Sequence, residues 1–214
     1  MGIYIEALIL YIVLFFSGST GSIAGTEVSQ SFSIARELVR IFMYTLPSIA
    51  LIWYILLRAR KLREWNIRPG KKDLISCLIT LPCLIITGLV IAFAASKVGE
   101  PAIQISLHSP STALEWVILC ISCICAAYLE ESFFRFYLLG RREELKLNYV
   151  QALVLSVALF SVCHLYEGPW GVLNAVISGT ILAFIFIRYK SLHGIAIAHS
   201  LYNIAVYVIN TIQL

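Results

Sequence analysis

The sequence is poor in charged residues. Only 13% of its 214 residues are Asp, Glu, Lys or Arg, whereas a soluble domain carries about 25%. Apolar residues make up 60% of the chain, and the mean hydropathy is +0.88. These values exclude an ordinary soluble domain and predict a polytopic membrane protein.

Several other features are missing. We find no low-complexity tract, no internal repeat and no linker longer than about 17 residues, so we interpret residues 1–214 as a single membrane domain. The six cysteines all lie in apolar stretches, which indicates small packing residues and no disulfide framework. An HExxH motif, typical of one class of zinc proteases, is absent, and the sequence leaves the use of a metal open.

Long apolar stretches are what the chain does contain. A membrane-spanning helix needs roughly 20 mainly apolar residues. Seven stretches come close to this length, at about 3–17, 34–57, 74–96, 113–139, 149–165, 170–188 and 193–212. The first and the fifth are short and could be tilted, extended or re-entrant. The sequence therefore predicts an all-α bundle of about seven transmembrane helices.

The positive charges predict the orientation of this bundle. Twelve of the 16 Lys and Arg fall between stretches two and three, four and five, and six and seven, which are connections on the same side. Positive charge favours the cytoplasm, so we expect the N-terminus inside and the C-terminus outside. The net charge of +4 fits contact with the anionic headgroups of the lipid bilayer and gives no reason to expect nucleic acid as a partner.

Three charges lie near the end of the fourth stretch, where charge is costly and is a sign of function. Glu131 and Arg135 are four residues apart, so on a helix they share a face and can neutralise each other. Glu130 is rotated by about 100° from Glu131 and has no local partner. We therefore interpret Glu131 and Arg135 as a structural pair and Glu130 as available for chemistry. The alternative is that all three form one buried ionic network.

Further polar residues follow on two other apolar stretches. His164 ends the fifth stretch, four residues after Phe160, and His199 shares a helix face with Asn203 in the seventh. Together with Glu130, these side chains could converge on a water molecule, or on a metal with a water. A carboxylate can accept a proton from such a water. Imidazoles can bind a metal or donate to a developing oxyanion, and an amide can hold the oxyanion in place. The reaction class that this suggests is hydrolysis of an acyl or peptide bond.

The motifs Glu130-Glu131-x-x-x-Arg135, Phe160-x-x-x-His164 and His199-x-x-x-Asn203 resemble those of the CPBP intramembrane proteases, also called the CAAX prenyl protease 2 or ABI family. The resemblance covers residues 113–210, which we interpret as the catalytic core, and it implies an all-helical membrane fold with an internal active site. It also implies that Glu130 activates a water and that His164, His199 and Asn203 complete the site. Glu131, Arg135 and Phe160 would support these residues.

The resemblance leaves two mechanisms open. Glu130, His164 and His199 would suit a divalent metal such as zinc, or Glu130 could activate the water without a metal. The shortness of the chain is more similar to prokaryotic members, which suggests a prokaryotic cytoplasmic membrane. The partner would be a membrane-associated protein or peptide substrate: a prenylated CAAX-like tail, a bacteriocin leader, a C-terminal sorting tail or a membrane regulator.

Two readings without peptide cleavage remain as alternatives. The first is a non-catalytic scaffold, immunity factor or regulatory protein of the same fold. The second is a small transporter or proton relay, because chains of intramembrane Glu and His also serve that purpose.

Overall fold

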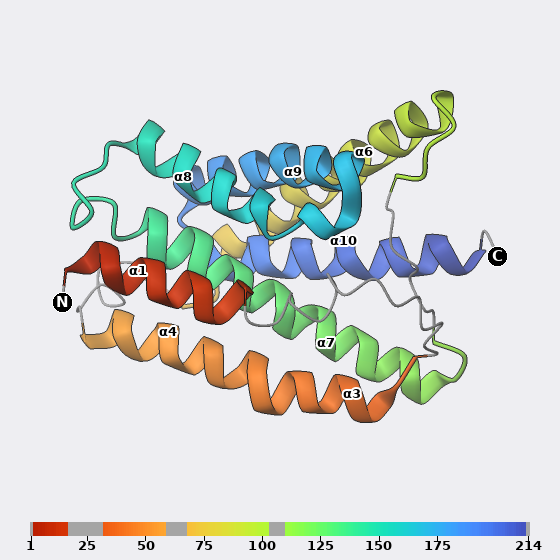
Figure 1. The fold of residues 1–214 in the computed structure, drawn as a ribbon, viewed down its shortest axis with the longest axis horizontal. Coiled ribbons are helices and arrows are strands. Elements are labelled where there is room, and N and C mark those ends of the chain that lie inside the picture. Colours follow the sequence, from red (N-terminus) through yellow and green to blue (C-terminus); the bar gives the residue numbers. More distant parts are fainter. Residues whose placement is uncertain (1, 17–31, 59–67, 103–109, 213–214) are drawn as a thin grey trace.

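The computed structural model describes residues 2–16, 32–58, 68–102 and 110–212 (Figure 1). These residues form helices and contain no strand, which confirms the predicted all-α class. The α-helices are α1 (Ile3–Tyr11), α3 (Ile34–Val39), α4 (Leu46–Arg58), α6 (Lys71–Lys97), α7 (Ala113–Glu131), α8 (Tyr149–Val162), α9 (Gly168–Tyr189) and α10 (Leu192–Ile212). The more widely wound π-helical turns are η1 (Ile12–Phe16), η2 (Arg40–Thr45) and η3 (Ser132–Leu139), and η4 (Leu165–Glu167) is a short 3₁₀ turn.

Five continuous helical stretches in the described residues are long and apolar enough to cross a membrane. They are Ile34–Arg58, Lys71–Lys97, Ala113–Leu139, Leu165–Tyr189 and Leu192–Thr211. Two shorter apolar helices, Ile3–Phe15 and Tyr149–Val162, correspond to the two stretches that the sequence marked as short. The predicted membrane-embedded helical bundle is therefore confirmed, with five long helices and two short ones.

Helix α10 lies at the centre of the bundle, packed against α6 and α7, while α9 packs against α8 and α6. The stretch from α3 to α4 runs alongside α7 in the same direction (Figure 1). Two contacts tie these neighbours together: Arg40 hydrogen-bonds Ser122, and the indole Nε1 of Trp53 donates to Ser132 Oγ at 3.0 Å. This arrangement brings side chains of η2 beside the middle of α7.

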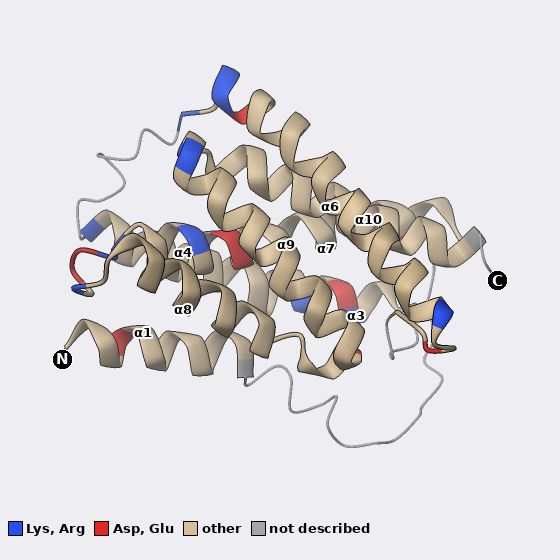
Figure 2. Cartoon of the chain, turned by 90° about the horizontal axis from the view of Figure 1, so that it is seen from above, with Lys and Arg blue, Asp and Glu red and all other residues tan. Residues whose placement is uncertain are grey.

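Most Lys and Arg residues of the described chain lie at one end of the bundle. Figure 2 shows Lys and Arg at the end of α4, at the beginning of α6 and at the end of α9, close to the N-terminus. The C-terminus lies at the opposite end. Residues 59–67, which contain several of the basic residues that predict the orientation, lie outside the described residues.

Local sequence signals explain where the two helices of the first two motifs begin. The Thr112 side chain accepts a hydrogen bond from the Glu115 backbone N–H, and Glu115 accepts one from the Thr112 backbone in return. Asn148 and Gln151 form the same reciprocal pair at the beginning of α8. Such capping boxes satisfy backbone donors that a helix leaves free at its first turn.

Helix α7 changes its winding directly after Glu131. In the π-helical continuation η3, the Gly140 N–H bonds to the Arg135 carbonyl five residues earlier, at 3.1 Å. All eight side chains of η3 are buried, among them Phe133 and Phe134. Single π turns inside helices occur frequently at functional sites, and here the turn contains Arg135, which is fully buried.

Candidate active site

Glu131 is the centre of a buried ionic cluster. The Glu131 and Arg135 side chains are both 0% exposed, with Arg135 Nε 3.2 Å from Glu131 Oε2. The Nε–H does not point at that oxygen well enough for a hydrogen bond, so the contact is chiefly electrostatic. The other oxygen, Oε1, lies 2.9 Å from Nδ1 of His199. Because an ionised carboxylate can only accept a hydrogen bond, Nδ1 of His199 carries a proton and donates a hydrogen bond to Glu131.

Arg135 is held by two further contacts. Its Nη2 donates to the Gly179 carbonyl at 3.1 Å, and its guanidinium lies 4.5 Å above the Phe160 ring. A Cβ at position 179 would lie 3.0 Å from the Phe160 ring, so glycine allows α9 to approach the ring and the cation this closely. The predicted pair of Glu131 and Arg135 is thus present, and Phe160 packs against it.

Glu130 has different surroundings from its neighbour. Its side chain is 23% exposed, and its Oε2 lies 3.7 Å from Nε2 of His199. That oxygen forms no hydrogen bond with any described residue. One imidazole therefore lies between two adjacent carboxylates: Glu131 holds its Nδ1, and Glu130 faces its Nε2. Of the two acids, Glu131 is fully buried and only Glu130 lines the cavity, where a substrate or a water could give it a proton.

His164 lies where α8 ends and η4 begins. Its Nδ1 is 2.8 Å from the Phe160 carbonyl oxygen, which can only accept, so Nδ1 carries a proton. In the neutral ring Nε2 is then an acceptor, and it lies 4.0 Å from Oε1 of Glu167. The His164 ring also packs on Phe160, with centroids 4.5 Å apart. These contacts hold the ring in one orientation, with Nε2 available to a ligand.

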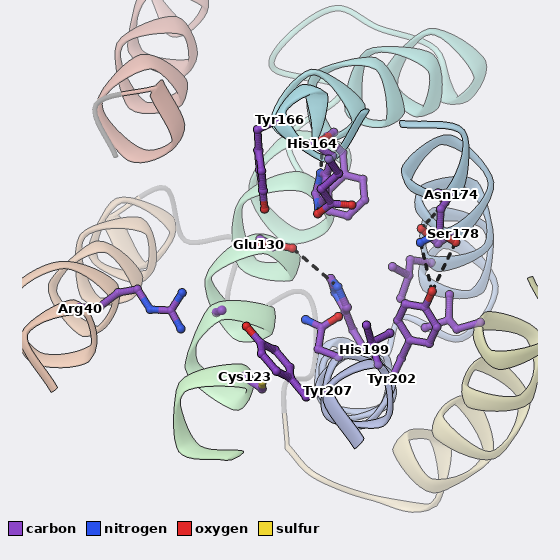
Figure 3. A pocket seen from close by; sticks show the side chains of 17 residues that line it. Arg40, Cys123, Glu130, His164, Tyr166, Asn174, Ser178, His199, Tyr202 and Tyr207 are labelled. Atoms are coloured by element: carbon purple, nitrogen blue, oxygen red, sulfur yellow. Dashed lines mark hydrogen bonds and ion pairs between the residues drawn. The ribbon is translucent and has the colours of Figure 1, made fainter. Parts of the chain in front are cut away.

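A cavity of about 210 Å³ joins these groups (Figure 3). Glu130, His164, His199 and Asn203 all line it, and Figure 3 shows the carboxylate and both rings facing the same space. The Asn203 side chain forms no hydrogen bond with the residues that the structure describes. The structure therefore brings all four residues to one cavity, while their catalytic roles stay a prediction.

Other polar side chains line the same cavity and were not singled out from the sequence. They are Arg40, Tyr166, Glu167, Asn174, Ser178, Tyr202 and Tyr207. Glu167 follows His164 by three residues, and this acid near a candidate histidine was a signal that could have been used. Asn174 and Tyr202 hydrogen-bond each other at 3.1 Å across α9 and α10. That contact depends on tertiary packing and has no signal in the local sequence.

The metal site that the sequence left open requires three or more ligands close together. Among the described residues, no three His, Cys, Asp or Glu side chains lie close enough to hold one ion. Glu130 and His199 approach each other, but among the described residues no third His, Cys, Asp or Glu side chain is close enough to both of them to complete a set of ligands. The predicted ligands Glu130, His164 and His199 therefore do not fit a metal in this arrangement.

Comparison with known proteins gives one result. Residues 112–205 match the family model of Rce1-like proteins, described as type II CAAX prenyl endopeptidase Rce1-like. No curated protein and no solved structure matches the chain. The match confirms the resemblance that the three motifs carry, and it supports peptidase activity in a membrane protein.

Proposed function

Because residues 112–205 belong to the family of Rce1-like, type II CAAX prenyl endopeptidases, we propose that this protein hydrolyses a peptide bond in the tail of a membrane-associated protein, with Glu130 as the base. The supporting observation is that Glu130, His164, His199 and Asn203 line one cavity between membrane-spanning helices. A CAAX-like tail on a prenylated protein is the substrate that we favour. Residues 113–210 form the catalytic part in this proposal, and the cation-rich end of the bundle faces the cytoplasm.

The cavity has room for the reaction. Its 210 Å³ far exceeds the space of about 10–15 Å³ that one water needs by the same measure, so it has room for a water beside a segment of peptide chain. Hydrolysis inside a membrane requires a water that is kept in place by polar groups. Glu130 Oε2 has no hydrogen bond to the described residues, and His164 Nε2 can accept a second hydrogen bond, so the two can hold a water between them.

Proton transfer follows from this arrangement. The water oxygen attacks the peptide carbonyl carbon, and Glu130 takes the proton that the water releases. When the tetrahedral intermediate collapses, the C–N bond breaks and Glu130 returns that proton to the departing amine. General acid–base catalysis of this kind contributes typically 10²–10⁴-fold in rate.

His199 and Asn203 would stabilise the oxyanion of the intermediate. Glu131 holds Nδ1 of His199 at 2.9 Å, which leaves Nε2 directed to the side of Glu130. With both carboxylates and Arg135 charged, a His199 imidazolium brings the formal charge of this cluster to zero. In that state Nε2 carries a proton and can donate to the oxyanion together with the Asn203 amide. Removal of one such donor typically costs about 10²–10³ in kcat.

Cleavage assays on the purified protein in detergent test this proposal. The substrate is a fluorescent, farnesylated CAAX peptide, with a leader peptide and a sorting-tail peptide run in parallel. We expect Glu130→Gln and His164→Ala to remove cleavage, and Asn203→Ala to reduce kcat by about 10²-fold. Glu115→Gln is the matched control, because Glu115 is an acid in the first turn of the same helix and outside the cavity. Full activity in Glu130→Gln would show that another group is the base.

A further inference from the structure

Arg40 is a cation that lines the cavity but has no part in the mechanism above. It belongs to η2, outside the residues matched by the family model, and Figure 3 shows it extending toward the cavity from the helix opposite His199. As far as the structure describes the lining, its ionisable acids are Glu130 and Glu167, and Arg40 is its single Lys or Arg. The cavity therefore has carboxylates at Glu130 and Glu167 and a positive charge at Arg40.

Neighbouring groups contact only one nitrogen, Nη2, of the Arg40 guanidinium. Arg40 Nη2 lies 2.5 Å from Glu37 Oε2 and also contacts Ser122 Oγ, which in turn donates to Glu37 at 2.6 Å. The remaining donors, Nε and Nη1, form no hydrogen bond with a described residue. Since a guanidinium has five N–H donors in a planar fork, this contact leaves Arg40 able to bind a second carboxylate while Glu37 keeps it in place.

The separation between Arg40 and Glu130 predicts the number of substrate residues that fit between them. Ser122, which contacts Arg40, precedes Glu130 by eight residues on α7, so the two lie about 12 Å apart along the helix axis at 1.5 Å per residue. Cys123 and Ala126 line the cavity between them. Three residues of extended chain span roughly 10 Å. A peptide whose scissile bond lies at Glu130 would thus place its third following residue near Arg40.

We propose that Arg40 is a specificity-determining residue that binds the C-terminal carboxylate of the substrate, about three residues beyond the scissile bond. This inference rests on the proposed function and adds to it the residue that recognises the free end of the tail. Ser122 lies well inside the membrane span Ala113–Leu139, where a carboxylate is costly without an opposite charge. Arg40 supplies an opposite charge that the bound carboxylate would share with Glu37, and its planar fork matches the two carboxylate oxygens.

A binding measurement tests this site independently of cleavage. The protein carries Glu130→Gln to prevent turnover, and the probe is a fluorescent, farnesylated peptide ending in Cys-Val-Val-Met, made once with a free carboxylate and once with a terminal amide. We expect the free acid to bind at least about tenfold more tightly, as for other hydrogen bonds between charged groups. Adding Arg40→Gln should abolish this difference through weaker binding of the acid, and Arg40→Lys should retain part of it.

Two further variants separate a binding role from a structural one. Arg36→Gln is the matched control, since Arg36 is an exposed arginine one turn earlier that does not line the cavity, and it should keep the preference for the acid. Glu37→Gln removes the competing carboxylate and should widen the preference, whereas a purely structural Arg40–Glu37 pair predicts no widening. Peptides with one or five residues after the cysteine should show a smaller preference than the three-residue tail.

Every outcome bears on the inference. Equal binding of acid and amide by the protein with Arg40 intact, binding of neither, or an unchanged preference in Arg40→Gln would overturn the site. Cleavage is then measured in the chain with Glu130 intact. A preference for the acid that depends on Arg40, without any cleavage, would leave the site standing and refute the proposed peptidase activity instead.

Discussion

Replacing Glu131 by Gln should destabilise the protein strongly, while the same change at Glu130 should not. Arg135 is fully buried, and Glu131 is its counterion at 3.2 Å. The amide of Gln has nearly the shape of the carboxylate, so packing is kept and only the charge is lost. Removing one partner of a buried ion pair costs about 3–5 kcal/mol, because the other charge remains in a medium that cannot solvate it.

The matched change, Glu130→Gln, should lower the free energy of unfolding much less. Its side chain is 23% exposed to the cavity, and its Oε2 has no hydrogen bond to a described residue. We expect a smaller loss of stability than at position 131, since the Glu130 side chain is partly exposed and its nearest charged partner, His199, lies 3.7 Å away. The two variants differ by one position in the chain, so they compare a buried carboxylate with a cavity-facing one under the same conditions.

Equilibrium unfolding by SDS in mixed micelles measures these free energies, with the fluorescence of the four tryptophans as the signal. The double variant Glu131→Gln, Arg135→Met removes both charges and should recover most of the lost stability, because no uncompensated charge remains. Equal stability of Glu131→Gln and Glu130→Gln would refute the reasoning. So would a double variant that is less stable than Glu131→Gln.

Three other predictions follow from the structure and the sequence. A Cβ at Gly171 would lie 2.3 Å from Cβ of Glu167. Gly171→Ala should therefore displace η4 together with His164 and lower kcat/KM by roughly 10²-fold. Unchanged kinetics would show that the position of η4 is not needed for activity. Incubation with EDTA should leave cleavage intact, since the described acids and histidines form no metal-binding group, and inactivation that zinc reverses would contradict this. In a cysteine-free chain, a cysteine at position 66 should be labelled from the cytoplasm only, because positive loops are retained there; labelling from outside would reverse the proposed orientation.

The helical bundle was predictable because each part of it is a local property. An apolar stretch of about 20 residues has few alternatives to a membrane-spanning helix, and the two stretches that were too short are the two short helices of the structure. The pairing of Glu131 with Arg135 was equally local. Four residues on a helix place two side chains on one face, and the pair needs no information about any other helix.

The candidate site was predictable only as a set of residues. Three short motifs on separate apolar stretches named Glu130, His164, His199 and Asn203, and all four line one cavity. Which of these side chains face each other was decided by the packing of α7 against α10. The sequence predicted that Glu131 pairs with Arg135, with a network of Glu130, Glu131 and Arg135 as the alternative. In the structure Glu131 also contacts Nδ1 of His199, and Nε2 of that ring faces Glu130.

The remaining features depended on tertiary structure entirely. Arg40 and Ser122 are 82 residues apart in the chain and meet because α3, η2 and α4 run alongside α7. The 3.6-residue period of a helix states which side chains share a face, but it does not state which neighbouring helix that face will meet or at what height. The sequence by itself determined the apolar helices and the polar residues that they carry. The packing of those helices decided which charged side chains face each other and how far Arg40 lies from Glu130.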